Sequence, residues 1–231
     1  MDCWGLKAAS MFRIVFLKGS LLLLLTIISS CSRRNESAGV PYYNTPDFTP
    51  QFFSLASEAD QKINHSIAPF AFTDQHGKKI TEKDIEGKIH IANFIFTSCG
   101  SICPLMTRHL KLVQSAFLDN PDVVILSYSV TPWIDSIGRL KEFADNQGIH
   151  SNNWHLLTGD KGEIYTLARK SYFAEEDLGF TRDSTEFLHT EHIILVDKKK
   201  RIRGIYNGTL QLDIEQMIKD INCLLKSGPQ K

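Results

Sequence analysis

Two cysteines, Cys99 and Cys103, are separated by three residues where an apolar run gives way to a helical pattern. The run 89–96 is β-prone, and Pro104 opens a helical pattern that continues to about Leu118. Proline is tolerated in a first helical turn because its missing N–H has no intrahelical partner there. The unpaired N–H groups and the positive end of the helix dipole favour thiolate at such a place. Thiolates attack disulfides and bind soft metals, so this arrangement indicates redox or metal chemistry.

The spacing of Cys99 and Cys103 leaves both kinds of chemistry open. In a regular helix the two Cβ atoms would lie about 6 Å apart, whereas a disulfide needs about 3.8 Å. The loop before the helix must therefore bend if the two sulfurs are to bond on oxidation. In the reduced state two thiolates can hold one soft ion, and Cu(I) favours thiolate sulfur. A structural zinc site usually has four protein ligands, and the absence of a second cysteine pair favours copper over zinc.

The chain has room for one domain that positions these thiols. Of its 231 residues, 42% are hydrophobic and 23% are charged, as in ordinary soluble globular proteins. The 26 basic residues balance 26 acidic ones, so the formal net charge is zero. This balance gives no electrostatic reason to expect nucleic acid as a partner. We expect residues 65–226 to form the domain and residues 227–231 to form a short tail.

Strand and helix patterns alternate along the expected domain. Apolar runs predict strands at 67–73, 88–96, 122–130, 154–157, 192–196 and 202–206, the last two forming a hairpin. Helical spacing predicts helices at 104–118, 137–146, 160–170 and 212–225. Asp160 and Glu163 have the spacing of a capping box for the third helix. Residues 171–186 show no clear period and are interpreted as an inserted loop. The alternation predicts an α/β fold.

Residues 1–31 have the pattern of a targeting segment. Three basic residues precede an apolar core, and small residues lead to Cys31. This pattern is typical of a lipoprotein signal, in which Cys31 would carry the lipid and begin the mature chain. The alternative is an uncleaved anchor, but about 12 apolar residues fall short of the roughly 20 that a spanning helix needs. We expect a domain tethered to the membrane on the periplasmic side of the cell envelope, with residues 32–64 as a spacer that partly packs on it.

Two motifs together resemble a known family. Residues 97–104 read TSCGSICP, and residues 188–197 read LHTEHIILVD. With a strand before the first motif and a helix after it, the chain resembles the Sco/SenC family over roughly residues 65–225. The resemblance implies a thioredoxin-like fold, with a central mixed β-sheet flanked by helices. It also implies that Cys99, Cys103 and His189 bind copper. The partner that it implies is the copper-A subunit of cytochrome c oxidase or another cuproprotein.

Two positions depart from the family pattern. Gly100 stands where the family usually has proline, which should loosen the loop between the cysteines. Thr131 stands where an acidic residue is frequent, so any role of that acid is in question. Neither departure touches the predicted ligands.

His189 is the predicted third ligand. One imidazole added to two thiolates gives a site suited to Cu(II) as well as Cu(I). His192 competes for this role, but it lies three residues later and would face the opposite way in an extended strand. His109 falls on the apolar face of the helix after the cysteines, where a packing role is expected. Cys223 is interpreted as a small buried hydrophobe.

Two functions compete on these residues. A metallochaperone would bind Cu(I) and Cu(II) and pass copper on by ligand exchange. A thiol-disulfide oxidoreductase would attack a partner disulfide with one cysteine and resolve the mixed disulfide with the other. Thioredoxin-type reductases carry a cis-proline opposite their cysteines, whereas this chain has no proline between Pro132 and Pro229. His189 lies in that region instead, which favours copper handling, with reduction of the copper-A cysteines as the alternative. A peroxidase is disfavoured because Phe96 stands where that family has threonine.

Overall fold

The computed structural model describes residues 39–174 and 190–227. Its strands are β1 (Tyr42–Tyr43), β2 (Pro50–Gln51), β3 (Ala71–Asp74), β4 (Lys79–Thr81), β5 (Ile89–Ile95), β6 (Val123–Ser129), β7 (Trp154–Thr158), β8 (His192–Val196) and β9 (Ile202–Asn207). Its helices are α2 (Ala56–Lys62), α3 (Ile102–Ala116), α4 (Ile137–Gln147), α5 (Lys161–Thr166) and α6 (Gln211–Lys226), and α5 continues into a π-helix, η1 (Leu167–Ser171).

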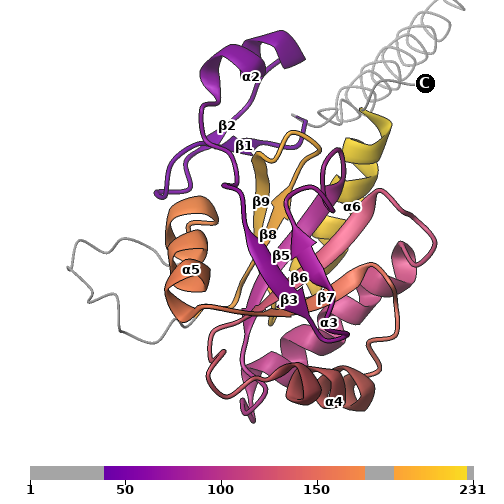
Figure 1. The fold of residues 1–231 in the computed structure, drawn as a ribbon. Helices are drawn as coiled ribbons and strands as arrows, with labels where there is room; N and C mark the ends of the chain where they lie inside the picture. The colour runs from indigo at the N-terminus through magenta and orange to yellow at the C-terminus, as the bar shows by residue number, and fades with distance from the viewer. Residues whose placement is uncertain (1–38, 175–189, 228–231) are drawn as a thin grey trace, which may run out of the picture. The chain divides into compact units, whose positions relative to one another are not determined.

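The strands form one mixed sheet with helices on both faces (Figure 1). Across the nine strands that the described residues contribute, the order is β2-β1-β9-β8-β5-β6-β7-β3-β4. β5, β6 and β7 run parallel to one another, and the other neighbouring pairs are antiparallel. β8 and β9 form the predicted hairpin. The α/β architecture predicted from the alternation is thus confirmed.

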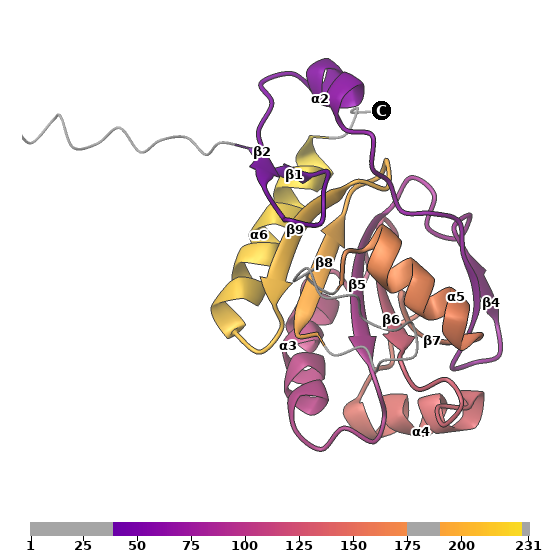
Figure 2. The ribbon, with the colours of Figure 1, turned by 90° about the vertical axis from the view of Figure 1, so that its left-hand side faces the viewer.

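The central strands are buried on both faces. Every residue of β5 and β6 is buried, as near-continuous apolar runs predict for parallel strands covered on both sides. Successive side chains of β5 enter different cores: Ile91 and Ile95 pack with α3, α4 and α6, and Ala92 and Phe94 pack with α5 and η1. Figure 2 shows α3 and α6 on one side of the sheet and α5 on the other.

Several element boundaries differ from the prediction. The strand expected at 67–73 is only β3, because Pro69 has no N–H for a ladder and Ile67 N–H binds the Lys200 carbonyl instead. The helix expected at 104–118 begins at Ile102. The helix expected at 160–170 is confirmed in place, but its second half is η1. Its cap is also confirmed, since Asp160 Oδ1 accepts the Glu163 N–H at 2.9 Å.

Two burial predictions are corrected. The inserted loop was expected to begin at residue 171, but Ser171 to Ala174 are buried, with Tyr172 fully so; the remainder, 175–188, lies outside the described residues. Cys223 was expected to be buried and is exposed, because α6 turns Ile221 and Leu224 toward the sheet and Cys223 away from it.

The segment expected as a spacer is ordered from residue 39 onward. Its strand β1 pairs with β9 through Tyr43 and Ile202, and Ala59 and Ile63 of the α2 region form a small apolar cluster with Tyr42. The described residues from Gly39 onward form one compact unit. None of the helices in the described part of the chain combines the length and apolar character that crossing a bilayer requires.

Candidate metal centre

The two thiols lie at the turn from β5 into α3. After β5, the Cys99 N–H donates to the Phe96 carbonyl at 3.1 Å, which curls the chain before the helix. α3 then begins at Ile102, so Cys103 is the second residue of its first turn. The predicted placement of Cys103 at the helix start is therefore confirmed. Cys99 is half-buried and Cys103 is 4% exposed, and both are free thiols.

The sulfur of Cys99 acts as a cap for α3. The first N–H groups of a helix have no intrahelical partner, and Ser101, at the N-cap position, makes no side-chain cap bond. Instead the Cys103 N–H donates to Cys99 Sγ at 3.4 Å. The Cys99 sulfur thus lies at the positive end of a 15-residue helix, where a thiolate is stabilised.

The surroundings of the two thiols shift their pKa values in opposite directions. Burial alone would raise the pKa of Cys99, but hydrogen bonds from the Cys103 and Ser101 backbone N–H groups outweigh it and the pKa lies below its ordinary value. Burial raises the pKa of Cys103 to about 12, against one backbone hydrogen bond from Phe96. Cys99 and the charge of Asp135 add to that rise. The exposed thiol is therefore the better nucleophile, and the buried thiol keeps its proton until a metal or a disulfide displaces it.

A buried carboxylate, Asp135, supports the start of the thiol loop. Its side chain is fully buried and accepts hydrogen bonds from Thr97 Oγ1 (2.6 Å), Ser129 Oγ (2.6 Å) and Thr131 Oγ1 (2.9 Å), and from the Thr97 N–H (3.3 Å). Sequence reasoning missed this residue. The available signal was the departure at Thr131, because a hydroxyl there suits an acid four residues later.

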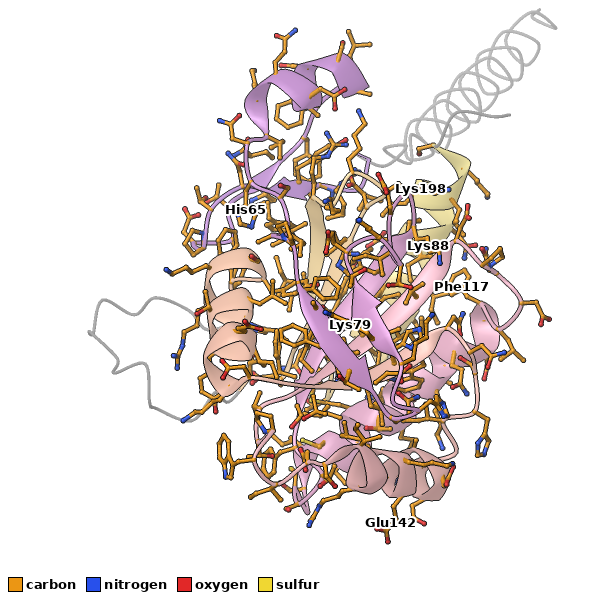
Figure 3. The ribbon with its side chains drawn as sticks, in the orientation of Figure 1. His65, Lys79, Lys88, Phe117, Glu142 and Lys198 are labelled. Carbon is orange, nitrogen blue, oxygen red and sulfur yellow. The ribbon has the colours of Figure 1, made fainter. Side chains whose placement is uncertain are left out.

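Arg139, in the first turn of α4, contacts the same loop from the solvent side. Its Nε donates to Thr97 Oγ1 at 2.7 Å and its Nη2 donates to Ser98 Oγ at 2.9 Å. Its distance to Asp135 Oδ1 is 3.8 Å, so the ion pair is looser than the hydrogen bonds. Sequence reasoning also missed this residue. Figure 3 labels Glu142 of α4 at this end of the molecule.

Of His109, His189 and His192, the structure describes two. His189 lies outside the described residues, as does Cys31. His192 packs edge-on against Phe48, with ring centroids 5.8 Å apart, on the face of β8 that carries Ile194. Cys103 belongs to the core on the other face. His109 binds the Gly208 carbonyl through Nδ1 at 2.8 Å, which agrees with a packing role.

The thiol pair offers donor atoms that suit a soft metal ion. Two sulfurs at one helix start are suitable donors for Cu(I). Among residues 39–174 and 190–227, no group of three or more His, Cys, Asp or Glu side chains is arranged to hold a metal ion.

A mixed sheet whose central strand delivers two thiols to a helix start is the architecture of thioredoxin-like dithiol proteins. Within that class, the sequence identifies one family. The sequence model of the SCO1/SenC family matches residues 58–226, and the chain belongs to this family.

Three solved structures are similar in fold and sequence. BsSco, described as a member of the Sco family of cytochrome c oxidase assembly proteins with a disulfide switch, is 32% identical with a TM-score of 0.61, over 72% of this chain and 96% of its own. A SCO1/SenC family lipoprotein from Bacillus anthracis str. Ames is 30% identical with a TM-score of 0.61, over 71% and 96%. Bradyrhizobium japonicum ScoI, solved with copper bound, is 25% identical with a TM-score of 0.54, over 69% and 99%.

Proposed function

We propose that the protein is a membrane-tethered copper metallochaperone that binds copper through Cys99, Cys103 and His189. It delivers that copper to the copper-A centre of cytochrome c oxidase. The observation that carries the proposal is the pair of free thiols at the start of α3, with one sulfur accepting the N–H of the other cysteine at 3.4 Å. Membership of the SCO1/SenC family, which includes the copper-bound ScoI of Bradyrhizobium japonicum, supports it.

The two thiols would play unequal parts in taking up copper. Cys99 is more exposed and more acidic, so it offers the first thiolate to an incoming Cu(I) ion. Cys103 must lose its proton to become the second ligand, so uptake releases that proton to solvent. In delivery Cys99 would again be the first to exchange, because a partner's ligand reaches its more exposed sulfur before that of Cys103. His189 supplies the nitrogen that Cu(II) prefers.

Tethering is part of the same proposal. The lipoprotein-type segment 1–31 would leave Cys31 as the lipidated first residue, with the domain on the periplasmic side of the membrane. The similar Bacillus anthracis protein is described as a lipoprotein. A chain held at the membrane surface would meet a membrane-embedded oxidase subunit by two-dimensional diffusion.

Reduction of partner cysteines is the second candidate function. It is favoured by the unequal acidities of the two thiols, since a reductase needs an exposed attacking thiolate and a resolving thiol behind it. The similar protein BsSco is described as containing a disulfide switch. The same two residues would serve, with Cys99 attacking and Cys103 resolving.

The deciding experiment is copper loading of the full-length protein, purified in mild detergent, reduced, and loaded anaerobically with Cu(I). We expect one copper per chain, with two sulfur ligands by X-ray absorption. Cys99→Ala or Cys103→Ala should abolish retention against a thiol competitor, because one thiolate cannot hold the ion. His189→Ala should weaken Cu(II) much more than Cu(I). Cys223→Ala, which removes an exposed cysteine on α6, is the matched control and should change nothing.

Two results would overturn the proposal. Loss of copper from the wild-type protein to a modest thiol competitor would leave the reductase function, to be tested by the reduction potential of the Cys99–Cys103 pair. An unchanged Cu(II) spectrum in His189→Ala would remove that residue from the ligand set.

A further inference from the structure

The loop that carries Cys99 has little to hold it from within. Gly100 follows Cys99, and a Cβ built on it meets no atom within 4 Å, so this part of the loop lies in open space. Glycine has the largest backbone freedom of any residue. Between the end of β5 and the start of α3, the backbone hydrogen bond from the Cys99 N–H to the Phe96 carbonyl is one internal restraint. Besides the hydrogen bonds that Cys99 Sγ accepts from the Ser101 and Cys103 backbone N–H groups, further restraint on this loop must come from outside it.

Arg139 supplies such a restraint. Its guanidinium donates to two successive side chains, Thr97 and Ser98, at 2.7 and 2.9 Å. Both bonds join α4 to a segment 41 and 42 residues earlier in the chain. The planar fork of arginine suits two acceptors at fixed spacing. The second acceptor, Ser98, immediately precedes Cys99, so the brace ends one residue before the cysteine whose sulfur must be positioned.

A second basic residue on α4, Lys141, shows that contact with the thiol loop is not a general property of cations on this helix. Lys141 is about as exposed as Arg139, at 53% against 45% of the side chain. Its partner is Asp145 on its own helix, at 3.0 Å. Removing Lys141 therefore removes a cation of similar exposure from the same helix without touching the thiol loop.

We propose that Arg139 is a positioning residue of the copper site, a brace that holds residues 97–98 so that the Cys99 sulfur stays beside the Cys103 N–H. The inference deepens the proposed copper function and rests on it for its consequence, the retention of Cu(I). Arg139 acts through Thr97 and Ser98 and need not touch the metal. Loss of the brace lets the Gly100 loop open, which separates the two sulfurs.

Hydrogen exchange on the reduced, copper-free, full-length protein tests the brace itself. In Arg139→Ala we expect the amides of Cys99 and Cys103 to exchange about fivefold faster, as loss of modest hydrogen bonds predicts. The amides of β5 should not change. Arg139→Lys, which can keep one of the two bonds, should fall between, and Lys141→Ala should match the wild type. Unchanged exchange at Cys99 and Cys103, or faster exchange throughout the sheet, would overturn the proposal.

Copper retention tests the consequence. Against a chelator, Arg139→Ala should release Cu(I) about fivefold faster than the wild type. Adding Gly100→Ala should recover most of that loss, because it lowers the freedom of the open loop at a position with space for a methyl group and without positive φ. Failure of Gly100→Ala to recover any retention would contradict loop opening as the cause. If the wild type binds no Cu(I), the proposed function fails while hydrogen exchange still decides the brace.

Discussion

Two of the buried carboxylates, Asp135 and Asp197, lie near opposite ends of the sheet and have different surroundings. Asp135 lies at the thiol end, beside α4, and Asp197 lies at the other end, in the β8–β9 turn marked by Lys198 in Figure 3. Asp197 Oδ2 contacts the guanidinium groups of Arg201 at 3.0 Å and Arg203 at 3.2 Å. Asp135 is held by hydroxyl groups and one N–H, and the guanidinium of Arg139 lies 3.8 Å away.

The difference in partners gives the two carboxylates different consequences. Arg201 and Arg203 neutralise the charge of Asp197, and both also contact the N-terminal segment. Arg203 stacks on the Tyr42 ring at 3.6 Å and donates to the Pro41 carbonyl, and Arg201 binds Asp60 at 2.7 Å. This group of residues, the arginine clasp, fastens residues 39–62 to β9. At Asp135 the charge is stabilised but not neutralised, so it acts on its neighbours and raises the pKa of Cys103. One carboxylate fastens structure and the other tunes a site.

The largest expected effect breaks the clasp. Arg203→Ala leaves Asp197 with one buried partner fewer and removes the stacking on Tyr42, which should lower the free energy of unfolding by about 3 kcal/mol. Urea denaturation measures it. Lys62→Ala, which breaks an exposed pair with Glu58, should cost under about 0.5 kcal/mol. Copper bound per folded chain should stay the same in both variants. A loss of copper in folded Arg203→Ala would mean that the two ends are coupled.

How well the sequence predicts a feature depends on whether the residues that form it are neighbours in the chain. The strand–cysteine–helix order was predictable because an apolar run, two cysteines and Pro104 are neighbours in the chain. Asp135 and Arg139 were not, because their contacts with Thr97 span 38 and 42 residues and no local pattern encodes them. The prediction that Cys223 is buried was wrong, because the nearby Ile221 and Leu224 face the sheet while Cys223 lies on the exposed side of the helix. β1 was missed because two residues form a strand only when β9 is there to pair with.

The second prediction is that Cu(I) affinity at the thiol end depends on pH, whereas the arginine clasp at the other end does not. Because Cys103 has a pKa near 12, it is protonated in the free protein at neutral pH and must release its proton to bind Cu(I). The apparent Cu(I) affinity should therefore rise at least about tenfold per pH unit between roughly pH 6 and 8. Competition with a chelator of known protonation measures this. The clasp should show no such dependence, because guanidinium stays charged throughout. A flat affinity profile would mean that Cys103 is not a ligand or is already ionised.

The smallest effect comes from removing only the charge of Asp135. Asp135→Asn keeps the size and one acceptor oxygen, so Thr97 and the other hydroxyl donors can keep part of their hydrogen bonds, at a cost of about 1–2 kcal/mol in stability. Burial is the main cause of the raised pKa of Cys103, and the smaller contribution from the Asp135 charge is then gone. In a Cys99→Ser background, alkylation of Cys103 at a fixed alkaline pH should become roughly two- to fivefold faster. Asp122→Asn, which neutralises an exposed carboxylate paired with Lys198 near the other end of the sheet, is the control and should leave that rate alone. If Cys103 in folded Asp135→Asn reacts at the original rate, the Asp135 charge does not affect the pKa of the thiol. Asp135 would then have a structural role alone, like Asp197, and the two carboxylates would differ only in the segments that they hold in place.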